Sequence, residues 1–121
     1  MLQLAALLIV ALGVAHSVLG ERYILVRLFR RPDLPKIFGS SDFTVRTLRF
    51  AWHITTIAWF GLAALVFAAS QGELNSQNAL RIIGYTAIAS GLLPLVITRG
   101  RHLSWLVLFA IGGLALNASA A

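Results

Sequence analysis

Residues 2–20 read LQLAALLIVALGVAHSVLG, an apolar run without a single formally charged side chain. A helix needs about 20 mostly apolar residues to cross the hydrocarbon core of a bilayer. This run therefore predicts a membrane-spanning helix. Backbone groups in lipid must be hydrogen-bonded within the segment itself, which favours a helix over an open strand.

Three more uncharged runs of similar length follow, and the four runs together take up most of the chain. The predicted fold class is all-α, an integral membrane four-helix bundle made of two helical hairpins. A single transmembrane domain would then cover the whole chain, residues 1–121. The expected spans are residues 2–20, 50–70, 82–98 and 103–118, with a basic loop over residues 21–49.

The composition agrees with a membrane protein. Of the 121 residues, 59% are hydrophobic and only 12% are charged, whereas soluble domains have about 25% charged residues. The net charge is +6, but the basic residues lie between spans, so we expect no nucleic-acid partner. The absence of cysteine excludes disulfides, iron–sulfur clusters and a cysteine nucleophile.

Positive charge is distributed unevenly along the chain. Nine of the ten lysines and arginines lie in the basic loop or between the third and fourth spans, and the tenth is Arg81. Because basic loops stay in the cytoplasm, we expect both termini in the periplasm of a bacterial inner membrane. The basic loop should then rest on anionic lipid headgroups.

The basic loop is expected to be partly helical. Apolar residues recur at helical spacing as far as about Arg30, which predicts that the first helix continues beyond the membrane. Pro32 and Pro35 would end it, and Ser41 or Asp42 can cap the start of the next helix. Two helices should therefore project from the cytoplasmic face.

Small residues predict where the helices approach one another closely. Pro94 also removes a backbone hydrogen bond within the third span, which predicts a kink or a polar pocket near Ser90. The small-residue positions expected in helix–helix contacts are Gly13, Ser17, Ala87, Gly91, Gly112 and Gly113.

Ionisable residues near the cytoplasmic boundary are the candidates for a functional site. His16 and His53 each lie four residues, about 6 Å, inside this boundary, so antiparallel helices would place them at the same depth. Arg49, His53, Thr56 and Phe60 share one stripe of the second helix. We expect five side chains to converge at this end of the bundle: His16, Glu21, Arg49, His53 and His102.

Several functions remain open for such a site. It could be a hydrogen-bonded network in which Glu21 pairs with Arg49 or Arg22 and the histidines bridge helices. The histidines could instead relay protons, or His16 and His53 could be the axial ligands of haem b. The competing hypothesis is a non-catalytic accessory or scaffolding subunit, acting as a homo-oligomer or in a larger membrane complex. A metal ion such as zinc or iron would be bound by His16, Glu21, His53 and His102.

Overall fold

The computed structural model describes all 121 residues and contains only helices and their connections. The prediction of an all-α fold with four apolar helices is confirmed. The first helix is continuous from Leu2 to Leu28 and includes a π-helical segment, in which the Val26 N–H donates to the carbonyl of Glu21 five residues earlier. The elements are α1 (Leu2–Leu19), η1 (Gly20–Leu25), α2 (Val26–Leu28), α3 (Asp42–Ser70), α4 (Ser76–Ile97) and α5 (Ser104–Ala120).

Both predicted extensions beyond the apolar runs are present. The first helix reaches Leu28, close to the predicted end at Arg30, and α3 begins at Asp42, eight residues before the predicted span. Ser41 occupies the N-cap position of α3, although its side chain makes no capping hydrogen bond. With 29 residues, α3 is roughly 44 Å long, which exceeds the thickness of a hydrocarbon core of about 30 Å.

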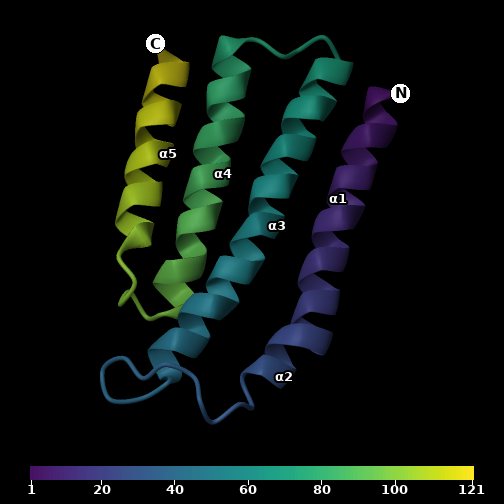
Figure 1. The fold of residues 1–121 in the computed structure, drawn as a ribbon. Coiled ribbons are helices and arrows are strands. Elements are labelled where there is room, and N and C mark those ends of the chain that lie inside the picture. Colours follow the sequence, from purple (N-terminus) through teal and green to yellow (C-terminus); the bar gives the residue numbers. More distant parts are fainter.

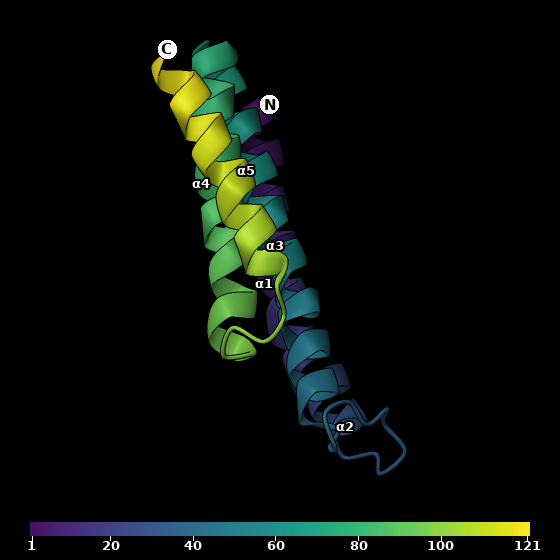
Figure 2. The same cartoon turned by 90° about the vertical axis from the view of Figure 1, so that its left-hand side faces the viewer.

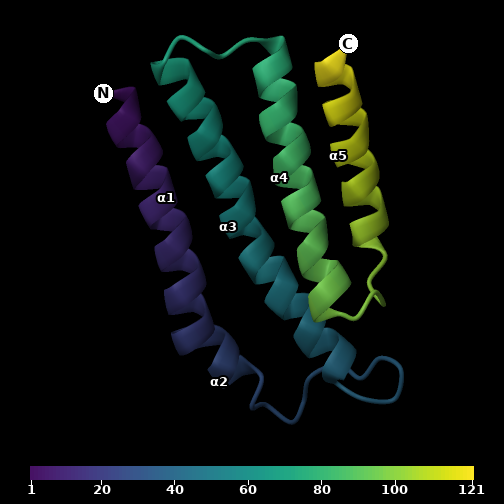
Figure 3. The same ribbon diagram turned by 180° about the vertical axis from the view of Figure 1, so that it is seen from behind.

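The four helices lie in a row rather than around a common centre. From one edge to the other the order is α1, α3, α4 and α5 (Figures 1 and 3), and the row is narrow when it is viewed edge-on (Figure 2). Close backbone contacts join α1 to α3, α3 to α4, and α4 to α5, but not α1 to α4 or α5. The two hairpins therefore do not close into a compact bundle.

The two ends of the row differ in charge. The termini and the α3–α4 connection lie at one end, whereas residues 29–41 and the α4–α5 connection lie at the other (Figure 1). We call the second end, formed by residues 20–49 and 98–102, the basic end. It carries nine of the ten lysines and arginines, and the tenth, Arg81, lies near the start of α4. The uneven distribution of charge along the sequence is therefore also an uneven distribution in space.

Three of the helices are long and apolar enough to cross a membrane: Leu2–Leu28, α3 and α4. The fourth, α5, is also apolar but has only 17 residues. Only 17 of the 121 residues are buried within the chain, because a single row of helices leaves most apolar side chains on its two faces.

Glycines allow the close contacts between neighbouring helices. A Cβ atom at Gly61 of α3 would lie 2.4 Å from the hydroxyl oxygen of Thr86 on α4. One at Gly112 of α5 would lie 2.6 Å from Ile88. The predicted contact positions Gly13, Gly91 and Gly112 are all buried between helices, whereas Gly113 has nothing within 4 Å of its Cβ position.

Candidate functional site

A chain of hydrogen bonds crosses the contact between the first helix and α3. On α3, the His53 imidazole lies with Nδ1 2.9 Å from the hydroxyl of Ser17 and Nε2 2.9 Å from Oε2 of Glu21. The Ser17 hydroxyl is also 2.6 Å from Oγ1 of Thr56, which donates to the carbonyl of Gly13 at 3.1 Å. We call Ser17, Glu21, Arg49, His53 and Thr56 the seam network.

Helical spacing brings these side chains together. Ser17 and Glu21 are four residues apart on the first helix, so both face α3. The predicted stripe of α3 faces the first helix in return: Arg49 and His53 contact Glu21, and Thr56 contacts Ser17. The stripe continues to Phe60, whose ring lies 3.1 Å from the Cβ position of Gly13.

Arg49 holds the outer end of the seam network. Its Nη2 is 2.9 Å from Oε1 of Glu21, and its guanidinium lies 4.9 Å from the centre of the Phe29 ring. The predicted pairing of Glu21 with Arg49 is therefore the one found. The Nε atom of Arg49 is buried and has no hydrogen-bond acceptor. The guanidinium is therefore held only by the ion pair and the ring contact.

His16 lies on the other flank of the same helix–helix contact. Its ring stacks on the Trp52 indole at 4.6 Å with the planes 3° apart, and Trp52 Nε1 donates to the His16 carbonyl at 3.0 Å. Nε2 of His16 lies 3.2 Å from the Trp52 carbonyl and 2.9 Å from the Thr55 hydroxyl. Because a carbonyl can only accept, Nε2 carries the ring proton in this arrangement.

The two histidines do not face each other. His16 precedes Ser17 and Trp52 precedes His53, and adjacent residues point about 100° apart on a helix. One pair, His16 and Trp52, therefore lies on one flank of the contact, and the other pair, Ser17 and His53, lies on the opposite flank.

His102 does not join the other predicted residues, which corrects the expected convergence of five side chains. Its ring packs on Phe43 and Phe50 of α3, with centroids 6.1 and 4.8 Å away, and Nδ1 lies 2.8 Å from the Ser104 hydroxyl. The open row explains this position, because neither α4 nor α5, which flank His102, has a close backbone contact with the first helix.

The residues do not fit the predicted metal and haem sites. No group of three or more His, Cys, Asp or Glu side chains is close enough to share a metal ion, because His16, His53 and His102 lie in three different places. Both ring nitrogens of His53 are already hydrogen-bonded, which leaves none for haem iron. The helices also touch at Gly13 and Gly20, which leaves no room for a macrocycle between them.

The order hydroxyl, imidazole, carboxylate is one that transfers protons. The same order activates serine nucleophiles in hydrolases, but there backbone N–H groups must also stabilise an oxyanion. Ser17 lies inside a helix, whose N–H groups are used by the helix itself. The helix therefore provides no free backbone N–H group to stabilise an oxyanion beside Ser17.

Four polar residues of this region were not among the predicted site residues: Ser17, Trp52, Thr55 and Thr56. Ser17 was expected only as a small contact residue, although a hydroxyl four residues before Glu21 in an apolar helix is the signal that could have revealed it. Comparison with known proteins finds no family, curated protein or solved structure that matches this chain. The chemistry of the seam network is therefore the basis on which a function can be proposed.

Proposed function

We propose that this chain is an integral membrane protein whose seam network takes up and releases a proton at the basic end. The observation that carries the proposal is the uninterrupted series of hydrogen bonds from Glu21 through His53, Ser17 and Thr56 to the Gly13 carbonyl. Imidazole is the side chain whose ordinary titration range includes neutral pH.

With a neutral His53, the hydroxyl protons point toward the imidazole. The Glu21 carboxylate accepts a hydrogen bond from Nε2–H, so Nδ1 is an acceptor and the Ser17 hydroxyl donates to it. Ser17 can then only accept from Thr56. The single proton of the Thr56 hydroxyl is shared between two acceptors, Ser17 and the Gly13 carbonyl.

With a protonated His53, the two hydrogen bonds of the Ser17 hydroxyl run in the opposite direction. Nδ1–H donates to Ser17, Ser17 donates to Thr56, and Thr56 donates to the Gly13 carbonyl. Every acceptor then has a proton of its own, and Glu21 lies between two cations, His53 and Arg49. Uptake of one proton thus reverses both hydrogen bonds of the Ser17 hydroxyl and leaves the Thr56 proton to the Gly13 carbonyl alone. It also strengthens the contact between the helices.

The chain of bonds ends inside the protein, which favours sensing over conduction. Gly13 lies seven residues, about 10 Å, further along the helix than Gly20. Beyond Gly13 toward the N-terminus the only polar side chain of the first helix is Gln3. A proton that enters from the basic end therefore leaves from the same end, and reconstituted protein should not make vesicles permeable to protons.

The orientation that we propose follows from the charge of the basic end. Short basic segments remain in the cytoplasm, so the basic end would face the cytoplasm and both termini the periplasm of a bacterial inner membrane. Arginines at this end would contact anionic headgroups, and the seam network would respond to cytoplasmic pH.

The experiment is an NMR titration that follows the imidazole of His53 and the methyl group of Thr56 together. We expect the Thr56 methyl signal to change with the same midpoint as His53, because the Thr56 hydroxyl changes from a donor to Ser17 into an acceptor from it. The Thr86 methyl group serves as a control, since its hydroxyl donates to the Ile82 carbonyl within α4 and lies away from the seam network. In Ser17→Ala the His53 titration should persist while the response of Thr56 disappears.

Two results would contradict the proposal. The first is a His53 ring that does not change protonation over the pH range in which the protein stays folded. The second is a Thr56 signal that ignores the titration of His53, or that still follows it in Ser17→Ala.

A second candidate is an accessory subunit, and the open row favours it. The first helix contacts only α3, and α5 contacts only α4, so both edges of the row are free to meet a copy of this chain or a larger membrane complex. Cross-linking in native membranes, followed by mass measurement, tests this candidate, and a strictly monomeric product would exclude it.

A further inference from the structure

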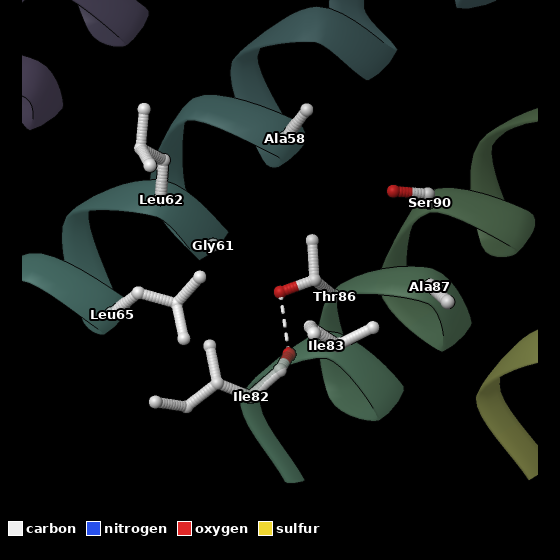
Figure 4. A pocket seen from close by; sticks show the side chains of 9 residues that line it. All are labelled: Ala58, Gly61, Leu62, Leu65, Ile82, Ile83, Thr86, Ala87 and Ser90. Carbon is white, nitrogen blue, oxygen red and sulfur yellow. Dashed lines mark hydrogen bonds between the residues drawn. The ribbon is translucent and has the colours of Figure 1, made fainter. Parts of the chain in front are cut away.

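A groove lies between α3 and α4, away from the seam network. The two helices approach most closely where Gly61 faces Thr86, and beside this contact the side chains leave a groove of about 300 Å³. Figure 4 shows its lining, in which Ala58 of α3 and Ala87 of α4 leave space because they are small. This volume is at the lower end of the range for small-molecule sites, about 300–1,000 Å³.

Ser90 places an unused hydroxyl in this apolar groove. The residue is only 6% exposed, and its oxygen points from α4 toward α3 (Figure 4). No hydrogen bond within the chain involves this hydroxyl, whereas those of Thr86 and Ser119 donate to carbonyls of their own helices, Ile82 and Leu116, each at 2.7 Å.

The position of Ser90 along α4 makes a hydroxyl without a hydrogen bond unusual. Ser90 lies seven residues before the helix end at Ile97, which is about 10 Å along the axis. At that depth the tails of lipids offer no hydrogen-bond partner. A polar group without a partner in such surroundings is energetically unfavourable, and a ligand that carries a polar oxygen removes this cost.

The two hydroxyls of the groove define the ligand. Thr86 uses its proton on Ile82, so its oxygen is available as an acceptor, while Ser90 has a proton to donate. A hydroxyl group both accepts and donates through one oxygen. We propose that the groove between α3 and α4 binds an apolar molecule that bears a hydroxyl group, a long-chain or isoprenoid alcohol, with Ser90 as its anchor.

A neighbouring groove provides an internal comparison. It lies along the same two helices, shares Gly61, Ile82 and Thr86, and is larger, at about 430 Å³. Ser90 is not among its lining residues. If size and apolar lining alone decided occupancy, an alcohol and a hydrocarbon would enter this second groove at least as readily as the first.

The test uses purified protein in detergent and two photoreactive probes, diazirine analogues of hexadecanol and of hexadecane. We expect the hexadecanol probe to label the residues around Ala58 and Ser90 in a saturable manner, with competition by unlabelled hexadecanol. Ser90→Ala should weaken its binding roughly fivefold, the factor for a hydrogen bond worth about 1 kcal/mol. The hexadecane probe should show no such dependence.

Two further variants give the test its controls. Ala58→Leu fills the groove from α3 and should abolish labelling, because Ala58 is exposed there and a larger side chain needs no repacking. Ser119→Ala removes a hydroxyl that is bonded within its own helix and should leave labelling unchanged. Equal binding of both probes, or unchanged hexadecanol binding in Ser90→Ala, would overturn the proposal and leave the groove as a place for ordinary lipid tails.

Discussion

The indole ring of Trp52 lies directly against the backbone of Gly20. A Cβ atom at Gly20 would be 2.1 Å from Nε1 of Trp52, and the indole N–H donates to the carbonyl of His16, one turn earlier. Because only glycine fits, this contact sets the distance between the first helix and α3. It therefore also sets the distances within the seam network on the opposite flank.

Replacement of this glycine should loosen the contact. We expect Gly20→Ala to lower the free energy of unfolding in detergent by about 1–3 kcal/mol, the usual cost of overpacking. Gly113→Ala is the matched control, because its Cβ position is open and alanine favours helices. If the conflict with the indole ring is the cause, Gly20→Ala should lower the free energy of unfolding little further in a protein that already carries Trp52→Ala. Additive losses in the double variant would show that the indole ring is not the cause.

The ion pair of Glu21 and Arg49 should depend on the shape of the guanidinium as well as its charge. We expect Arg49→Lys to lower the free energy of unfolding by about 1 kcal/mol, since lysine keeps the charge but loses the contact with the Phe29 ring. The side chains are 34% and 38% exposed, so solvent limits the effect. As a control, Arg99→Lys at an exposed position should change the free energy of unfolding by less than about 0.5 kcal/mol. An equal loss in both variants would show that the contact of Arg49 with the Phe29 ring does not stabilise the protein.

The connection between the first helix and α3 contains a pair whose response to pH can be predicted. Two hydrogen bonds from the Arg31 guanidinium hold the pKa of Asp33 below its usual value. A depressed pKa means that the pair favours the ordered loop above the pKa of an unfolded aspartate, and that this contribution is lost as pH falls through the folded value.

We therefore expect Arg31→Gln to raise the pKa of Asp33, as measured by carbon NMR of its carboxyl group. Lys36→Gln, in the same connection, should leave it unchanged. A pKa of Asp33 that is the same with and without Arg31 would show that the pair does not form in solution.

The proposed orientation can be tested by labelling, because the chain has no cysteine of its own. In intact cells, we expect a membrane-impermeant maleimide to label Glu73→Cys, in the α3–α4 connection, but Lys36→Cys only after permeabilisation. The reverse pattern would invert the orientation. Labelling of both positions in intact cells would argue against membrane insertion.

The sequence was sufficient to predict the helices but not their neighbours. Long apolar runs determine where helices form, and the spacing of Arg49, His53 and Thr56 identified the face of α3 that meets the first helix. In lipid, however, apolar side chains are equally well placed on every face, so hydrophobicity does not indicate which helices touch. The row in place of a closed bundle, and with it the position of His102, could not be predicted for this reason.

The details of the site also depend on contacts between helices. That Trp52 covers Gly20, and that His16 and His53 lie on opposite flanks, follows from the rotation of two helices about their axes. Rotation of either helix by a fraction of a turn would exchange the partners, and no local sequence pattern in either helix specifies this rotation. Ser17 was recognised as a contact residue but not as a hydrogen-bond partner for the same reason.

A row one helix thick has no interior of its own, and most of its stabilising apolar contacts must be completed by the surrounding medium. In the membrane-inserted state that we propose, the acyl chains on its two broad faces take the place that core side chains have in a globular protein. Their length and order should influence the spacing of the helices as directly as a mutation does, so bilayer composition becomes part of what determines the structure of this chain.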